Sequence, residues 1–213
     1  MNYFLDLDLD LDSDFELAVS EASQVLKEGR LVLFPTDTVY GVAAIPTNKS
    51  AVEEIFQRKN RLDDQACAVL VSEVSQASEL VVSSAEFELL SQKFWPGPLT
   101  VVIERAKHLD YFLGGDESSI GVRCPDHDFV RSLTEVVGPL AVTSANRSGV
   151  ETPENAKEAA EQLGENLLVV DGGECKGKPS TVVNLLANKT EILREGALGS
   201  EDLIAAGLRL HEG

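Results

Sequence analysis

Lys59 has the clearest chemical potential in this chain, because it continues the apolar stripe of a helix. The run from Ser50 to Arg61 predicts a helix whose buried face carries Ile55 and Phe56. Lys59 comes four residues after Ile55 and three after Phe56, so its side chain leaves the helix on their side. A lysine there is rarely buried without a partner. Lys59 therefore either extends into solvent at the helix end or lines a cavity for an anion, which Arg61 could share.

Two polar segments could complete such a site. Pro35-Thr-Asp-Thr-Val-Tyr-Gly follows the apolar run Leu31 to Phe34, and Ser144-Ala-Asn-Arg-Ser-Gly follows Leu140 to Thr143. Hydroxyl and amide side chains near backbone N–H groups at strand ends can hold phosphate or carboxylate oxygens. Each segment taken alone is equally typical of a polar turn. The sequence has no P-loop and no Gly-x-Gly-x-x-Gly after a strand, so an ATP site here would need a different cradle.

Helices and strands that could position these groups occur along the whole chain. Predicted helices are Ser13 to Gly29, Ser50 to Arg61, Ala85 to Phe94, Phe129 to Val137, Ala156 to Leu163 and Glu201 to Ala206. Predicted strands are Leu31 to Phe34, Val39 to Ala44, Ala66 to Val71, Leu99 to Ile103, Ile120 to Arg123, Leu140 to Thr143, Leu167 to Val170, Thr181 to Leu186 and Glu191 to Leu193. Strands often follow strands directly, which indicates an α/β protein with a twisted sheet of parallel and antiparallel strands.

The N-terminus has an unusual pattern, in which Leu-Asp occurs four times between Leu5 and Asp12. Strict alternation predicts an edge strand with an acidic, solvated face. A cation site and disorder are the alternatives. Further along the chain, Ser50 and Glu53 form a predicted capping box for the helix that carries Lys59.

Composition limits the class of protein. The chain has 213 residues, enough for a single domain spanning 1–213, and its net charge is −18. Such a charge disfavours non-specific nucleic-acid binding. Three dispersed cysteines and three dispersed histidines predict neither a disulfide framework nor a structural zinc site. No apolar stretch is long enough for a membrane span and no signal segment is apparent, so we expect a cytoplasmic protein without a membrane partner.

Seven short motifs occur in an order that resembles one family. They are Pro35-Thr-Asp-Thr-Val-Tyr-Gly, Lys59-Asn-Arg61, Phe94-Trp-Pro-Gly-Pro-Leu-Thr100, Gly121-Val-Arg-Cys-Pro-Asp-His127, Ser144-Ala-Asn-Arg-Ser-Gly149, Pro179-Ser-Thr-Val-Val183 and Ile192-Leu-Arg-Glu-Gly196. This series resembles the YrdC-like family in its short, single-domain form, over Gly29 to Gly196. The resemblance implies a twisted mixed sheet with helices packed around a central cavity.

The resemblance also implies an activity, the synthesis of threonylcarbamoyl-AMP and pyrophosphate from L-threonine, bicarbonate and ATP. Magnesium would accompany ATP as the cofactor. Separate transfer proteins would then move the threonylcarbamoyl group to tRNA, and stable nucleic-acid binding by this chain is not expected. No metal ligand is identified among its side chains.

Site residues follow from the same motifs. Lys59 and Arg61 match the family's Lys-x-Arg pair and would be the catalytic cations, holding the ATP phosphates. The remaining implied ATP contacts are Ser119, Ser144, Asn146 and Arg194. Arg123 would pair with the threonine carboxylate through its guanidinium fork. The other implied contacts at the threonine and bicarbonate end are Thr36, Thr38, Thr143 and Ser180.

The sequence departs from the family pattern after Arg61. Leu62 replaces a common proline, Gln65-Ala66-Cys67 replaces a polar-Pro-Leu sequence, and Leu70 stands where some relatives have histidine. These changes keep one alternative open, a YrdC-like paralogue with a different carbamoyl-adenylate substrate. A non-catalytic RNA-binding module is a second alternative, which the acidic charge disfavours.

Overall fold

The computed structural model describes residues 1–7, 12–60, 65–186 and 190–210. Its strands are β1 (Tyr3–Asp6), β2 (Val32–Phe34), β3 (Gly41–Ala44), β4 (Ala68–Leu70), β5 (Leu99–Glu104), β6 (Ser119–Arg123), β7 (Leu140–Ser144), β8 (Leu168–Asp171), β9 (Thr181–Asn184) and β10 (Glu191–Arg194). Its helices are α1 (Asp12–Lys27), α2 (Lys49–Lys59), α3 (Val74–Ser78), α4 (Ala85–Phe94), α5 (Asp128–Val137), α6 (Ala156–Leu163) and α7 (Ser200–Ala205).

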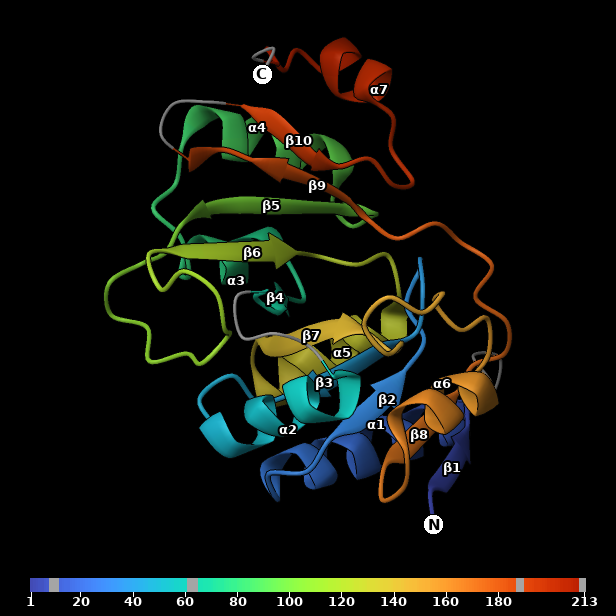
Figure 1. Ribbon diagram of the computed structural model, residues 1–213. Helices are drawn as coiled ribbons and strands as arrows, with labels where there is room; N and C mark the ends of the chain where they lie inside the picture. The colour runs from blue at the N-terminus through green and yellow to red at the C-terminus, as the bar shows by residue number, and fades with distance from the viewer. Residues whose placement is uncertain (8–11, 61–64, 187–189, 211–213) are drawn as a thin grey trace.

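All of these strands join one sheet, in the order β1-β8-β2-β3-β7-β4-β6-β5-β9-β10 (Figure 1). Strands β1 and β2 are parallel to β8, β4 is parallel to β6, and β5 is parallel to β9. The other neighbouring pairs are antiparallel. The predicted fold class, a mixed sheet with packed helices, is confirmed.

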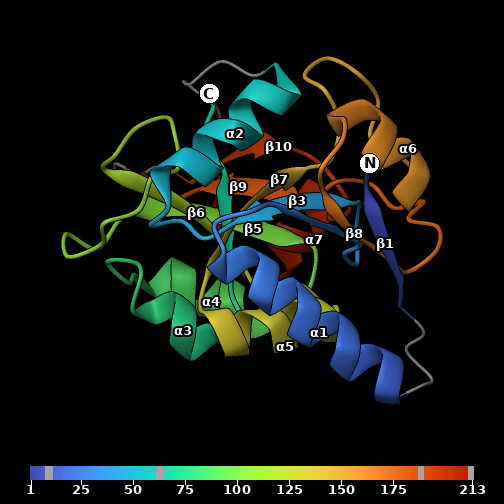
Figure 2. The ribbon, with the colours of Figure 1, turned by 90° about the horizontal axis from the view of Figure 1, so that it is seen from below.

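Helices cover both faces of the sheet. Figure 2 shows α1 and α5 on one side and α2 and α6 on the other. Strand β2 explains the arrangement, because alternate residues of an extended chain point to opposite faces. Val32 and Phe34 belong to the core beneath α1 and α5, whereas Leu31 and Leu33 belong to the core beneath α2 and α6. A strand buried on both faces reads as a continuous apolar run, as this one does.

Two predicted helix starts need correction. Helix α2 begins at Lys49, and Asn48 caps it by accepting a hydrogen bond from the amide of Ala51 at 3.2 Å, so the predicted capping box at Ser50 is wrong. Helix α1 begins at Asp12, so the predicted strand does not extend to that residue. Asn48 has the extended backbone and the side-chain oxygen that a helix cap requires.

The N-terminal prediction is confirmed only in part. Strand β1 lies at an edge of the sheet, where Leu5 and Leu7 are buried and Asp6 is exposed, as the alternation predicts. The Leu-Asp pairs between residues 8 and 11 lie outside the described residues. Helix α3 was not predicted from the sequence, because a segment of five residues is too short to show the helical period.

No helix in the described ranges has both the length and the apolar character needed to cross a membrane.

We predict that Phe129→Ala lowers the free energy of unfolding by about 3–5 kcal/mol, because it removes a fully buried ring. Phe129 on α5 packs edge-on against Phe34, with ring centroids 5.9 Å apart, and against Phe15 at 6.5 Å. Val136→Ala on the same helix is the control, since Val136 is 53% exposed and its truncation should stay within about 0.5 kcal/mol. Urea unfolding measures both, and equal losses in the two variants would contradict the assigned core.

A candidate anion-binding cavity

A cavity of about 510 Å³ lies over the middle strands of the sheet. Strands β3 to β7, β9 and β10 all contribute to its lining, together with the turn between β2 and β3 and the end of α2. Ten of the eleven predicted site residues line it: Thr36, Thr38, Lys59, Ser119, Arg123, Thr143, Ser144, Asn146, Ser180 and Arg194. The eleventh, Arg61, lies outside the described residues.

The charge of the lining is opposite to that of the protein. Lys59, Arg123 and Arg194 are cations, and the described lining residues include no aspartate or glutamate. The chain as a whole carries a net charge of −18. Positive groups gathered in a hollow with low-dielectric walls focus their field there and attract anions. The cavity is therefore a candidate anion site within an acidic molecule.

Lys59 lies at the last turn of α2 with only 2% of its surface exposed, so the alternative in which it extends into solvent is wrong. Its ammonium donates to the backbone oxygens of Ser144 and Asn146, and to Asn146 Oδ1 at 3.5 Å. These three acceptors are neutral oxygens of the turn after β7. Lys59 thus orders the turn after β7 and also places a positive charge beside it.

The turn after β7 is held from several directions. Ser144 Oγ donates to Asn146 Oδ1 at 2.5 Å, and the Asn146 amide nitrogen donates to the backbone oxygen of Val150 at 2.7 Å. The backbone N–H of Ser148 donates to the Lys59 carbonyl at 2.8 Å, so contacts run in both directions between the turn and α2. A turn fixed in this way presents its hydroxyl and amide groups to the cavity without further ordering.

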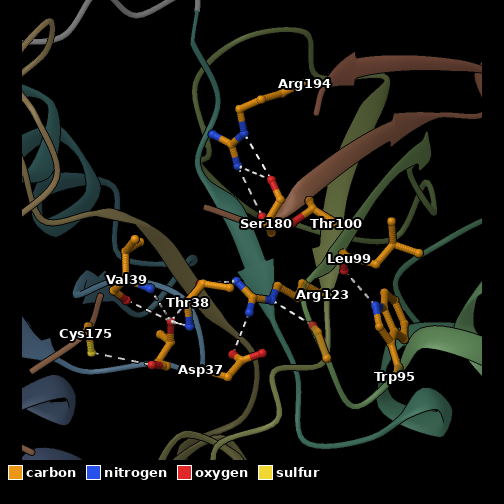
Figure 3. A network of polar contacts seen from close by, with 12 residues as sticks. Asp37, Thr38, Val39, Trp95, Leu99, Thr100, Arg123, Cys175, Ser180 and Arg194 are labelled. Atoms are coloured by element: carbon orange, nitrogen blue, oxygen red, sulfur yellow. Dashed lines mark hydrogen bonds and ion pairs between the residues drawn. The ribbon is translucent and has the colours of Figure 1, made fainter. Parts of the chain in front are cut away.

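Arg123 ends β6 and is 5% exposed, and its guanidinium has fixed partners on three sides (Figure 3). It donates to Gly97 O at 3.0 Å, to Thr38 Oγ1 at 2.9 Å and to Asp37 Oδ1 at 2.5 Å. Burial lowers the pKa of Arg123, and the Asp37 carboxylate opposes that change. An arginine remains protonated in proteins, so the group keeps its charge.

Thr36 and Thr38 form a compact hydroxyl pair in the turn between β2 and β3. Their hydroxyl oxygens are 3.0 Å apart, and Thr36 Oγ1 donates to Val39 O at 2.7 Å while accepting the amides of Thr38 and Val39. This is the self-bonding that lets Thr and Ser build turns. The polar turn predicted from the sequence is therefore also part of the cavity wall.

Arg194 and Ser180 form the opposite wall, at the edge where β9 and β10 pair (Figure 3). Arg194 donates to the backbone oxygen of Ser180 from Nε at 3.1 Å and from Nη2 at 2.9 Å. Its Nη2 also donates to Ser180 Oγ at 3.1 Å, and Ser180 Oγ lies 2.9 Å from Thr100 Oγ1. Arg194 is exposed, so it borders the opening of the cavity rather than its depth.

Sequence reasoning missed two groups at this site, Thr100 and Asp37. Thr100 lines the cavity beside Ser180, and a signal for it existed, because it is the one hydroxyl residue in the apolar run of β5. Asp37 does not line the cavity but ion-pairs with Arg123. Only the folded structure shows that pair, since the two residues are far apart in the chain.

Two glycines allow loops to pack closely against the cavity walls. A Cβ on Gly177 would lie 2.6 Å from the Thr38 carbonyl oxygen, and one on Gly196 would lie 2.1 Å from that of Pro179. Real Cβ contacts are never that short, so only glycine fits at either position. The connection from β8 to β9 therefore packs closely against the turn that carries Thr38, and the loop after β10 packs closely against Pro179.

Tyr40 supports the same region as a neutral phenol. Burial, followed by the nearby Asp171 carboxylate, raises the pKa of Tyr40. The phenol donates to Gly173 O at 2.7 Å and ties the β8–β9 connection to β3. In the part of the chain that the structure describes, no group of three or more His, Cys, Asp and Glu side chains could hold a metal ion.

Comparisons with known proteins agree with this geometry. The family model Sua5_yciO_yrdC, described as telomere recombination, matches residues 24–196. The threonylcarbamoyl-AMP synthase of Pyrococcus abyssi is 34% identical over 202 residues, which cover 92% of this chain and 59% of that protein. The putative threonylcarbamoyl-AMP synthase of Mycobacterium tuberculosis is 36% identical over 186 residues, with 86% of each chain covered.

A solved structure aligns over nearly the full length of this chain. It is P. abyssi Sua5 complexed with L-threonine, which superposes with a TM-score of 0.85 at 30% identity. The superposition covers 99% of this chain but 62% of that one. This chain thus spans about three fifths of the length of its P. abyssi relative.

We predict that inorganic tripolyphosphate, a probe of the anion cavity, raises the midpoint of thermal unfolding of the wild-type protein. A ligand at one hundred times its Kd stabilises the folded state by about 2.7 kcal/mol. Arg194→Ala should weaken apparent affinity about tenfold, since a charged hydrogen bond contributes roughly 1.5 kcal/mol. Lys107→Ala, at an exposed lysine outside the cavity lining, is the control and should bind like the wild type. An equal loss in both variants would show that the anion binds elsewhere.

Proposed function

The chain belongs to the Sua5/YciO/YrdC family, and on that basis we propose that it makes threonylcarbamoyl-AMP and pyrophosphate from L-threonine, bicarbonate and ATP. The observation that carries the proposal is the set of three cations around one cavity whose described lining has no carboxylate. ATP and bicarbonate are anions, and L-threonine carries a carboxylate. These negative groups must come together without mutual repulsion. A cavity of about 510 Å³ falls within the range of small-molecule sites.

At the nucleotide end, Lys59, Arg194 and the turn after β7 are the groups that favour phosphate binding. Lys59 lines the cavity and carries a positive charge, which attracts a phosphate. Ser144, Asn146 and Ser119 add hydroxyl and amide groups, and Arg61 would join them if its side chain reaches the same space. Fixed cations near the α-phosphate would stabilise the charge that develops as the carbamate attacks.

At the amino-acid end, Arg123 is the group suited to a carboxylate. A guanidinium has five N–H groups, and the contacts to Gly97, Thr38 and Asp37 use one from each nitrogen. One hydrogen on each terminal nitrogen then remains for a ligand, as far as the described residues show. Thr36, Thr38, Thr143 and Ser180 would hold the threonine hydroxyl and the carbamate oxygens.

The chemistry needs no covalent attachment to the protein. Bicarbonate takes up a proton and loses water to give carbon dioxide. The threonine amine then forms a C–N bond to that carbon and releases a proton, giving a carbamate. A carbamate oxygen then bonds to the α-phosphorus, and the bond to pyrophosphate breaks. The protein would contribute proximity, electrostatic stabilisation and exclusion of water from a labile product.

Magnesium, if it takes part, would enter with ATP. The described lining offers hydroxyl and amide oxygens but no carboxylate, and these are weak ligands for a hard cation without phosphate oxygens beside them. We therefore propose that the phosphates hold the ion and that it supplies charge neutralisation. Transfer to tRNA would fall to separate proteins in the cytoplasm.

One observation supports a second candidate, a paralogue with a different carbamoyl-adenylate substrate. Gln65, Ala66, Cys67 and Leu70, where the sequence departs from the family pattern, all line the cavity. Leu62, the remaining departure, lies outside the described residues. The described departures therefore line the space in which a ligand would bind. The RNA-binding alternative has less support, because Lys59 and Arg123 are buried where a polymer backbone could not reach them.

We predict that the purified protein releases pyrophosphate from ATP only when both L-threonine and bicarbonate are present, and that an acyl-adenylate appears in equal amount. Pyrophosphate and adenylate are measured together by coupled assay and mass spectrometry, with chelation of Mg²⁺ expected to stop both. Replacement of L-threonine by other amino acids distinguishes the two candidates. Pyrophosphate release that does not depend on L-threonine but requires another amine would favour the paralogue.

We predict that Lys59→Met lowers kcat/KM by about 10²–10³-fold, because loss of one preorganised charged donor has costs of this order. Methionine keeps much of the side-chain volume inside the cavity. Lys49→Met at the exposed start of the same helix is the matched control and should change kcat/KM by less than about twofold. Thermal unfolding confirms that both variants fold, and a folded Lys59→Met enzyme of normal activity would remove this lysine from the mechanism.

A further inference from the structure

Asp37 stands out because it is placed beside the cavity without lining it. Its neighbours Thr36 and Thr38 both line the cavity, whereas its carboxylate points to Arg123 (Figure 3). The ion pair is well shielded from solvent, with side-chain exposures of 6% for Arg123 and 13% for Asp37. Shielded pairs of this kind depend strongly on geometry, since each partner has lost its water.

The hydrogen bonds around Arg123 have only one possible direction. An arginine donates and never accepts, so Thr38 Oγ1 must accept from Arg123. The hydrogen of the Thr38 hydroxyl is therefore left to donate elsewhere. Thr36 Oγ1, 3.0 Å away, is one acceptor, but it already accepts the amides of Thr38 and Val39. A ligand oxygen in the cavity would be a better acceptor for the same hydrogen.

Asp37 is one of the groups that hold the guanidinium of Arg123 in its orientation. Its Oδ1 holds one terminal nitrogen of the guanidinium at 2.5 Å, while Gly97 O holds Nε at 3.0 Å. Two acceptors at different nitrogens fix the plane of the guanidinium. The remaining nitrogen, Nη1, then donates to Thr38 Oγ1. Without Asp37 the buried guanidinium would lack its charged partner and would turn toward other oxygens.

We propose that Asp37 is a positioning residue for the amino-acid substrate, acting through Arg123 and Thr38. It orients the guanidinium so that the remaining N–H groups of Arg123 and the hydroxyl of Thr38 donate together to the substrate carboxylate. The inference rests on the proposed function. Asp37 itself would not touch the substrate, because a carboxylate at the same place would repel the one that binds.

The test compares three variants: Asp37→Ala, Asp37→Asn and Asp126→Ala. Alanine removes the acceptor, whereas asparagine keeps an oxygen for Arg123 but not the charge. Asp126 is an exposed carboxylate three residues after Arg123 and serves as the matched control. Steady-state assays give KM for L-threonine, KM for ATP and kcat, and calorimetry gives Kd for L-threonine independently of turnover.

For Asp37→Ala we expect KM and Kd for L-threonine to rise by at least about tenfold, as when one charge-assisted hydrogen bond to a carboxylate is lost. KM for ATP should stay within about twofold, because the positioned groups do not face the phosphates. Asp37→Asn should show a smaller rise, of about three- to fivefold, since a neutral acceptor holds the fork less strongly. Asp126→Ala should match the wild type.

A folded Asp37→Ala protein with unchanged KM for L-threonine would overturn the inference. So would equal losses for threonine and ATP, which would indicate general damage to the fold. If Asp37→Ala fails to fold, the Asp37→Asn variant provides the test. A KM for L-threonine within about twofold of the wild-type value in that variant would then contradict the inference. A wild-type protein that neither binds L-threonine nor releases pyrophosphate would instead refute the proposed function.

Discussion

The burial of positive charge is the constraint on which this structure depends. Lys59 and Arg123 lie almost entirely out of water, and a buried cation is tolerated only when fixed oxygens replace its hydration. The two are satisfied in different ways. Lys59 is held by neutral carbonyl and amide oxygens, whereas Arg123 is paired with the Asp37 carboxylate. Both cations present donors to the cavity, and Arg123 does so beside a carboxylate.

This asymmetry suits two different anions. A polyphosphate is attracted by positive groups, and Lys59 and Arg194 both line the cavity. An amino-acid carboxylate needs oriented donors more than net charge, because the same substrate also brings a positive amine. The acidic exterior does not interfere, since exposed charges beyond roughly 8 Å are screened at physiological salt.

The order of strands in the sheet brings these groups together. Strand β3 pairs with β7 so that Gly41 lies opposite Ser144, and the Ala145 amide donates to Tyr40 O at 2.8 Å. The turn that carries Thr38 thus lies beside the turn held by Lys59. On the other half of the sheet, β5 pairs with both β6 and β9, which sets Thr100 next to Ser180. The described residues that depart from the family pattern, Gln65, Ala66, Cys67 and Leu70, line the same cavity.

The sequence by itself predicted the described helices except α3 and most of the described strands, because apolar periodicity is a local property. It also placed Lys59 on an apolar stripe, which left exposure and burial both open, and the ordered motifs named ten residues that line the cavity. Only the tertiary structure decided that Asn48 rather than Ser50 caps α2, that Asp37 pairs with Arg123, and that Thr100 belongs to the site. Each of these depends on the distance between segments remote in the chain or on a backbone angle, and spacing along a sequence contains neither.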